Sequence, residues 1–172
     1  MTIIDTARLR LRPWRDTDAP CLYELAKDPR IGMACGWAPH TSIEDAHQAL
    51  STVLSSSETY AVTQLDGGDL VGAIGLRTEN PDEPGVADLG YWIGSPYWGR
   101  GYATEAGTAI VERARALGMT TLTLGYFDGN EASRRVAEKL HFSWIGRDED
   151  VEFPLINRRH TLHRMALTLA QR

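Results

Sequence analysis

Alternating apolar and polar residues mark the strands in the first half of the chain. Leucine and arginine alternate over residues 8–12, which predicts a strand with one buried face. Two further apolar stretches, residues 60–65 and 70–78, flank the segment Asp66-Gly67-Gly68, which is typical of a hairpin turn. The first half therefore predicts antiparallel strands.

The stretch 86–94 predicts a further strand with two different faces. Side chains of a strand point alternately to its two sides, so the apolar face carries Leu89, Tyr91 and Ile93. The other face mixes an acid, glycines and an indole, and it carries Asp88, Gly90, Trp92 and Gly94.

Helical spacing of apolar residues predicts helices before and after this strand. The first covers residues 16–27 and stops before Pro29. Thr41 or Ser42 caps the next one, with Glu44 as the partner of Thr41 in a capping box.

The second half alternates helices and strands. The predicted order is a glycine-led helix, a strand, a short helix and two strands, over residues 99–118, 121–127, 130–140, 142–147 and 161–168. This order predicts the α/β class, as a mixed α+β sheet with flanking helices in a single domain over residues 1–172.

Composition and charge narrow the class of protein. The 172 residues include 18 lysines and arginines and 23 aspartates and glutamates, a formal net charge of −5. A mildly acidic chain is a poor candidate for binding phosphate backbones, so we expect no nucleic-acid partner. No apolar run is long enough to span a membrane, and the N-terminus lacks the apolar core of a secretory signal. Cys21 and Cys35 form neither a disulfide framework nor a zinc site, so we expect a cytoplasmic protein without metal.

The most informative segment joins the strand at 86–94 to the following helix. It reads Gly99-Arg100-Gly101-Tyr102-Ala103-Thr104. Small residues let a ligand approach the backbone, and the first N–H groups of a helix attract anions. The pattern favours a seat for a phosphate or pyrophosphate, formed by Arg100, Gly101, Ala103 and Thr104. The alternative is a tight turn without a ligand, and neither common nucleotide-binding motif fits the segment.

Five segments follow one another in a recognisable order: Leu9-Arg10-Leu11-Arg12-Pro13-Trp14, Trp37-Ala38-Pro39, Leu89-Gly90-Tyr91-Trp92-Ile93, residues 97–106, and Asn130-Glu131-Ala132-Ser133 with Lys139-Leu140-His141-Phe142. With these segments nearly the whole chain resembles the GCN5-related N-acetyltransferases (GNAT), in particular their RimJ/RimL-like branch.

The resemblance implies a fold and a cosubstrate. The two central strands, residues 89–94 and 121–127, would splay apart and hold acetyl-CoA between them. The pantetheine arm would pair with Trp92, Ile93 and Gly94, and the pyrophosphate would lie on the glycine turn. Asn130 and Ser133 would contact the arm from the other side.

Two positions depart from the family pattern. Trp98 stands where the broad family has glutamine or arginine, a replacement common in the RimJ/RimL-like branch. Ala137 stands where many relatives have a tyrosine that protonates the leaving thiolate. We therefore keep a non-catalytic acyl-CoA-binding module as an alternative, with a protein that binds another phosphate ester ranked below it.

Acetyl transfer to a primary amine in a ternary complex would need three groups. For the oxyanion we predict a strand N–H at Ile93 or Gly94. For the base we predict Asp88, with a surface aspartate as the alternative and Glu105 as a second carboxylate, more simply explained as a first-turn helix residue. For the leaving thiolate we predict a hydrogen bond from Ser133, with local helix capping as the alternative.

The acceptor is the least determined part. Trp37, between two predicted helices, is the residue that we expect on the acceptor side, together with Asp88. The acceptor would be a protein N-terminal α-amine or a small-molecule amine. The last strand and the first two helices are the candidate surface for a homodimer.

Overall fold

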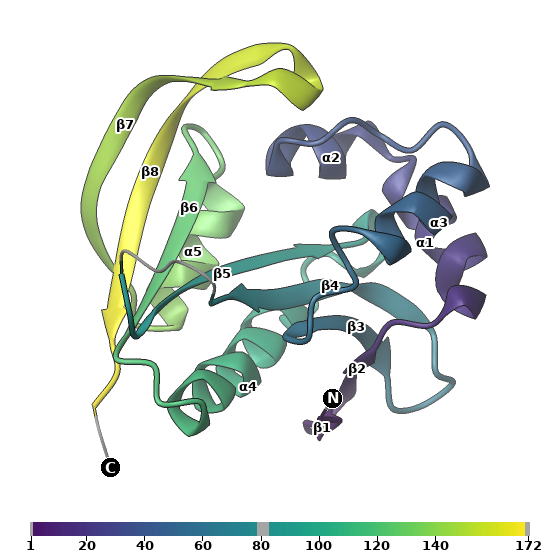
Figure 1. Cartoon of the computed structure of the whole chain (residues 1–172), viewed down its shortest axis with the longest axis horizontal. Helices are drawn as coiled ribbons and strands as arrows, with labels where there is room; N and C mark the ends of the chain where they lie inside the picture. The colour runs from purple at the N-terminus through teal and green to yellow at the C-terminus, as the bar shows by residue number, and fades with distance from the viewer. Residues whose placement is uncertain (1, 79–82, 171–172) are drawn as a thin grey trace.

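The computed structural model describes residues 2–78 and 83–170, which form a mixed sheet with helices on both faces (Figure 1). The strands lie in the order β1-β2-β3-β4-β5-β6-β8-β7. All neighbours pair antiparallel except β5 and β6, which are parallel. The strands are β1 (Ile4–Asp5), β2 (Leu9–Pro13), β3 (Thr59–Gln64), β4 (Leu70–Arg77), β5 (Val86–Ile93), β6 (Thr121–Phe127), β7 (Ser143–Phe153) and β8 (Arg158–Thr168).

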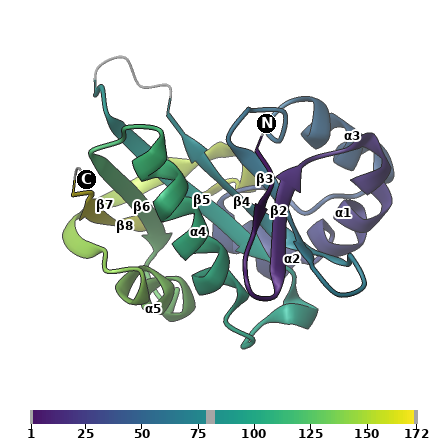
Figure 2. The ribbon, with the colours of Figure 1, turned by 90° about the horizontal axis from the view of Figure 1, so that it is seen from below.

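Helices cover the sheet on both sides, and Figure 2 shows α4 and α5 against one face with α1 and α3 beyond the other. They are α1 (Ala19–Ala26), α2 (Pro29–Cys35), α3 (Ile43–Ser51), α4 (Tyr102–Ala116) and α5 (Glu131–Lys139), with short 3-10 turns at Asp16–Asp18, Ser95–Tyr97 and Pro154–Ile156. Within the described residues no helix is both long and apolar enough to cross a membrane.

The two faces of β5 join two different apolar cores, as the alternation of its side chains predicts. Leu89 and Ile93 belong to the larger core, which packs the sheet against α4 and α5. Trp92 packs against the smaller core beneath α1 and α3. Burial of the apolar face stabilises the strand by roughly 25 cal/mol per Å² of apolar surface, whereas the other face is only partly covered.

Several predicted elements are confirmed, and their ends are corrected. The strands at residues 60–65, 70–78, 86–94 and 121–127 occur within one residue of the predicted ends. The glycine-led helix begins three residues later than predicted, at Tyr102, because Gly99 and Gly101 have positive φ angles of 75° and 79° that no α-helix contains.

The first helix ends before Pro29, as predicted, but the sequence analysis did not predict the helix that follows. Pro29 is the first residue of α2, where a missing N–H costs nothing. The Asp28 side chain caps this helix by accepting a hydrogen bond from the Arg30 N–H at 3.0 Å. The same local chemistry that stops α1 therefore starts α2.

The N-cap of α3 is Ser42, one of the two predicted cap residues, whereas the capping-box partner is Asp45 and not the predicted Glu44. Asp45 accepts from the N–H groups of both Thr41 and Ser42.

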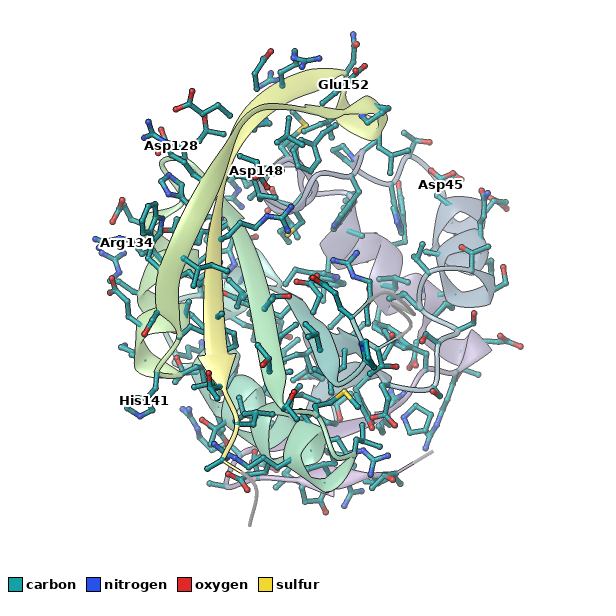
Figure 3. The ribbon with its side chains drawn as sticks, turned by 60° about the vertical axis from the view of Figure 1, so that its left-hand side comes forward. Asp45, Asp128, Arg134, His141, Asp148 and Glu152 are labelled. Carbon is teal, nitrogen blue, oxygen red and sulfur yellow. The ribbon has the colours of Figure 1, made fainter. Side chains whose placement is uncertain are left out.

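The last two strands are longer than the predicted stretches at 142–147 and 161–168. β7 and β8 pair as far as Phe153 and Arg158 and form a long hairpin. Figure 1 shows this hairpin curving over toward α2. Figure 3 looks onto it, with Asp148 and Glu152 on the hairpin and Asp128 just after β6.

Candidate active site

The sheet is split between its two central strands. β5 and β6 pair only through Val86–Thr121, Ala87–Leu122 and Asp88–Thr123. Beyond that point each strand continues with its other neighbour, β4 or β8. We call the unpaired part of β5 and β6 the split, and it lies where the sequence predicts the splayed strands.

Backbone groups of β5 point into the split at every second residue. The Gly94 N–H donates to the Val71 carbonyl of β4 at 2.8 Å, so it is already used within the sheet. Because backbone groups in an antiparallel pair alternate in direction, those of Ile93 and Tyr91 point the other way, toward β6. Of the predicted oxyanion donors, Ile93 therefore faces the split and Gly94 does not, while the Tyr91 amide shares the direction of Ile93.

Trp98 closes one end of the split. Its indole N–H donates to the Ile93 carbonyl at 2.6 Å, and the Arg30 guanidinium lies 5.4 Å from its ring centre. Asp28 links the two segments, because it forms an ion pair with Arg30 of α2 and accepts a hydrogen bond from the Ser95 hydroxyl, just after β5, at 2.6 Å. The Arg30 hydrogen bond, and then that of Ser95, holds the Asp28 pKa well below its usual range. Trp98, the departure from the family pattern, thus ties the split to α2.

The predicted phosphate seat lies at the N-terminus of α4. Gly101 is the N-cap residue, so the first helical amides are those of Tyr102, Ala103 and Thr104. These N–H groups have no acceptor within the helix, and they carry the positive end of its dipole. Arg100 lies beside them, with its guanidinium 5.6 Å from the ring centre of Tyr97. The structure therefore brings together all four residues that the sequence assigns to this seat.

Arg8, which the sequence analysis did not single out, supports this seat from β1–β2. Its guanidinium donates to the Arg100 carbonyl at 3.0 Å and lies 4.8 Å from the ring centre of Tyr102. It also pairs with Glu105 of α4 at 2.6 Å. Arg8 was missed because an arginine in an alternating strand reads as a solvated side chain.

Glu105 binds Arg8 and does not reach the acceptor face. Its carboxylate accepts from the Thr6 hydroxyl at 2.6 Å and from the Arg8 N–H at 2.8 Å. Burial raises the pKa of Glu105, but the hydrogen bonds from Thr6 and Arg8 outweigh this effect and leave the pKa below its usual value. The first-turn helix role is the one that the structure supports.

Asn130 and Ser133 lie at the N-terminus of α5, opposite β5. Asn130 is the N-cap, and its side-chain oxygen accepts from the Ser133 N–H at 3.1 Å. The cap uses only the oxygen, so the two N–H donors of this amide take no part in it. The Ser133 hydroxyl accepts from the Tyr91 hydroxyl at 3.2 Å, across the split. Ala137 is fully buried in the larger core.

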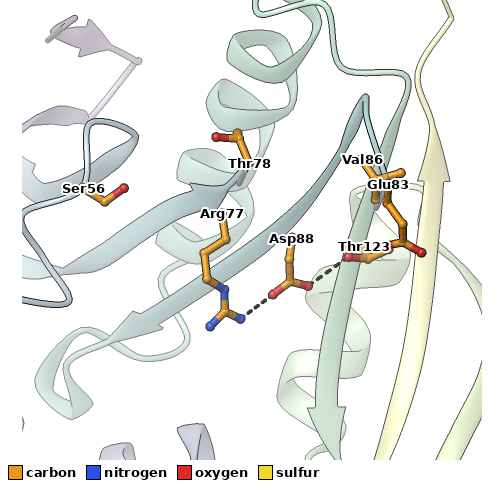
Figure 4. A pocket seen from close by; sticks show the side chains of 7 residues that line it. All are labelled: Ser56, Arg77, Thr78, Glu83, Val86, Asp88 and Thr123. Atoms are coloured by element: carbon orange, nitrogen blue, oxygen red, sulfur yellow. Dashed lines mark hydrogen bonds and ion pairs between the residues drawn. The ribbon is translucent and has the colours of Figure 1, made fainter. Parts of the chain in front are cut away.

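Asp88 stands where pairing of β5 and β6 ends. It forms an ion pair with Arg77 of β4 and accepts from the Thr123 hydroxyl at 3.0 Å. A cavity of about 340 Å³ opens beside it, and Figure 4 shows the side chains around this cavity. Asp88 and Ile93 are five residues apart on one strand, about 16 Å at 3.3 Å per residue. A group bound at the Ile93 amide is therefore beyond direct reach of the Asp88 carboxylate.

Gly90 leaves the sheet open between these residues, whereas the space beside Gly125 of β6 is filled by Leu162. Gly90 of β5 and Gly125 of β6 are exposed although they lie in central strands. A Cβ atom added to Gly90 would meet nothing within 4 Å. Gly90 shares a face with Asp88 and Trp92, so there is free space in front of the split on that face.

Trp37 lies on the same face as Trp92. The two indole rings meet edge to face, with centres 6.2 Å apart. His40 lies 5.7 Å from Trp37 by ring centres. The cavity beside Asp88 contains neither tryptophan among its lining residues, so the two predicted acceptor-side residues occupy separate parts of this face.

The end of α2 and the β7–β8 hairpin meet above the split. The Cys35 sulfur faces the Tyr91 carbonyl at 4.0 Å. The ring of Phe127 stacks on His160 at 4.4 Å and meets Phe153 edge to face at 4.6 Å. The neighbour of Cys35 is a carbonyl, not the histidine that a catalytic thiolate would need. In the described part of the chain no group of metal-ligating side chains occurs.

Family models, curated proteins and solved structures all match this chain to acetyltransferases. Residues 8–143 match the acetyltransferase (GNAT) domain family. The chain is 27% identical over 150 residues to the uncharacterized N-acetyltransferase YoaA of Bacillus subtilis, and the match covers 84% of each chain.

Solved structures share the fold. An acetyltransferase of the GNAT family from Bacillus anthracis superposes with a TM-score of 0.86 at 19% identity, covering 97% of this chain and 98% of that one. RimL, a ribosomal L7/L12 alpha-N-protein acetyltransferase in complex with coenzyme A, superposes with a TM-score of 0.83 at 21% identity, and 98% of each chain is covered.

Proposed function

The chain belongs to the GNAT family of acetyl-CoA-dependent N-acetyltransferases, and from that premise we propose that it transfers the acetyl group directly to a primary amine in a ternary complex. The observation that carries this proposal is the split, because pairing of β5 and β6 stops at Asp88–Thr123. An extended arm needs an unpaired strand of this kind for its own hydrogen bonds. The phosphate seat on α4 follows β5 directly, so one cosubstrate can use both.

The cosubstrate would lie along β5. Its pyrophosphate would rest on the amides of Gly101, Ala103 and Thr104 with Arg100 beside them. Its pantetheine arm would follow Gly94, Ile93 and Trp92 into the split. Asn130 would donate to the arm from α5, since the cap leaves its N–H groups available.

The amine would enter on the opposite face, over Gly90. Free space in front of Gly90 lies between Asp88 and Trp92 on one face of β5. The Cα atom of Asp88 is two residues away, about 7 Å along the strand. Its side chain extends over this face, so its carboxylate can reach the amine through one water molecule. Asp88 then takes the amine proton through that water, and Trp37 lines the approach beside Trp92.

The reaction balances with these groups alone. The amine nitrogen bonds to the acetyl carbon, and the split-facing amide of Tyr91, which is next to Gly90, donates to the oxyanion in place of the predicted Ile93 amide. The C–S bond then breaks, its electron pair stays on sulfur, and the Ser133 hydroxyl donates a hydrogen bond to the thiolate. Holding both reactants in line supplies much of the acceleration.

The test measures CoA release and acetylated product with two groups of amines. One group contains peptides with a free N-terminus, because RimL is an alpha-N-protein acetyltransferase; the other contains polyamines and amino sugars. We expect release with one group, and a loss of about 10²–10⁴-fold in kcat for Asp88→Asn, the range typical of a general base. The Kd for acetyl-CoA should not change in this variant.

Two results would contradict the proposal. Tight binding of acetyl-CoA without release on any amine would identify an acyl-CoA-binding module. If millimolar acetyl-CoA produces no thermal shift, the protein does not bind it, and both the acetyltransferase and the acyl-CoA-binding module are excluded.

A further inference from the structure

Tyr91 makes a contact that the proposed mechanism does not yet use. Its hydroxyl donates to the Ser133 hydroxyl at 3.2 Å, from the centre of β5 to the first turn of α5. Both side chains are half-buried. This contact lies beside the part of β5 whose backbone does not pair with β6.

The direction of this hydrogen bond decides what Ser133 can do. A serine hydroxyl has one proton and two acceptor lone pairs. A phenol is the stronger acid of the two and is the natural donor, so Tyr91 donates and Ser133 accepts. The single proton of Ser133 then points away from Tyr91.

Ser133 is held at a second point as well. Its main-chain N–H donates to the Asn130 side chain at 3.1 Å. The backbone is therefore fixed, and the hydrogen bond from Tyr91 excludes one of the three positions that the hydroxyl proton could take, so the proton turns away from Tyr91. Ala137, one turn further along the same helix face, is fully buried and has no donor of its own.

We propose that Tyr91 is a positioning residue for the leaving group, because it orients the Ser133 hydroxyl so that its proton is directed at the sulfur of the departing CoA. This inference rests on the proposed function. Tyr91 itself does not touch the sulfur and acts only through Ser133.

Proton transfer from Tyr91 is not part of this role. Burial raises the pKa of Tyr91 to about 12, despite an opposing contribution from Ser133. A thiol has a pKa of about 8.5, so a thiolate cannot remove the phenol proton at neutral pH. The C–S electron pair stays on sulfur, which leaves as a thiolate stabilised by the Ser133 hydrogen bond.

The test is a double-mutant cycle on kcat with Tyr91→Phe, Ser133→Ala and the double variant. Phenylalanine keeps the ring and removes only the hydroxyl. We expect Tyr91→Phe to lower kcat by about three- to tenfold, the size of one hydrogen bond, with the acetyl-CoA Kd changed less than twofold. Ser133→Ala should lower kcat further, and the double variant should equal Ser133→Ala.

A matched control is available on β3. Tyr60 is fully buried, and its hydroxyl donates to the Glu58 carboxylate at 2.7 Å. Tyr60→Phe removes the same atom at a site outside the proposed machinery, so kcat should stay within twofold of the wild type.

The outcomes separate this inference from the proposed function. If the wild type turns over an amine and Tyr91→Phe is fully active, or the two substitutions are additive, Tyr91 does not act through Ser133. If Tyr91→Phe changes only the melting temperature or the Kd, the contact is structural. A wild type that releases no CoA with any amine overturns both proposals.

Discussion

The two sides of the split are built in different ways. On the side where we propose that the cofactor binds (the cofactor side), α4 and α5 present backbone amides and polar side chains that are already fixed by Arg8, Glu105 and the Asn130 cap. On the acceptor side, exposed Gly90 leaves open space. The cofactor side is therefore complete without further contacts, whereas the acceptor side is defined mainly by what it leaves free. A common cosubstrate suits the first design, and a variable acceptor suits the second.

Among the substitutions that test this comparison, the largest effect on acetyl-CoA affinity should come from one on the proposed cofactor side. Gly101 has a φ of 79° at the N-cap of α4, and a side chain there costs about 1–2 kcal/mol. Gly101→Val would shift the first amides of the helix. We expect acetyl-CoA affinity to fall by about a hundredfold, the loss of one or two charge-assisted hydrogen bonds, as measured by calorimetry.

Gly118 provides the matched control for this prediction. It follows the other end of α4 with a φ of 78° and has open space around it. Gly118→Val introduces the same backbone strain and should leave acetyl-CoA affinity unchanged. Equal losses in both variants would mean that helix stability, rather than the phosphate seat, sets the affinity.

A smaller effect should come from filling the acceptor side. Gly90→Val places two methyl groups in the free space in front of the split, in a strand that tolerates β-branched residues. We expect kcat/KM for the amine to fall by about tenfold, because the amine is displaced from its line of attack. The Kd for acetyl-CoA should stay within twofold. Gly90→Ala should lie between the wild type and Gly90→Val; a loss of acetyl-CoA binding in either variant would show that the two sides are not separate.

The smallest effect should come from the support behind the phosphate seat. Glu105→Gln removes the charge that holds Arg8, whose side chain is 51% exposed. Solvent screens the Arg8 end of this ion pair, although Glu105 is only 16% exposed, so acetyl-CoA affinity should fall by about threefold.

This variant also predicts a pH dependence of stability. The Glu105 pKa is lower in the folded protein than in the unfolded chain, where it is about 4.3. Its contribution is therefore complete above that value and is lost as the pH falls through the folded pKa. In urea unfolding, the wild type should be more stable than Glu105→Gln at pH 7, and the difference should shrink below pH 4. A difference that stays constant with pH would assign it to packing.

Local sequence determined much of the cofactor side. The glycines before α4, the alternation along β5 and the cap at Asn130 are all features of neighbouring residues, so the sequence predicts them. The acceptor side depends on contacts between distant segments. Residues 148–160 are largely charged or irregular, and nothing in their pattern shows that they extend a hairpin toward α2.

Tyr91 shows the same limit within a single residue. Alternation correctly places it on the apolar face of β5, where a tyrosine reads as core. Its role depends on Ser133, which is 42 residues away, and on the separation of β5 from β6. The face of a strand on which a side chain lies can be predicted from one sequence. The residue that it contacts on a distant segment can be identified only from the folded structure.

Unpaired strand edges are normally a hazard, because another polypeptide can add to them and start aggregation. In this protein the unpaired edge lies in the middle of a sheet, between β5 and β6, with α5 behind it and the end of α2 above it. Because these helices flank the edge, a folded neighbour cannot pair with it as it could with an edge at the rim of the sheet. Because the unpaired backbone lies inside the sheet and not at its rim, an extended ligand can form hydrogen bonds with it, whereas a strand of another protein cannot.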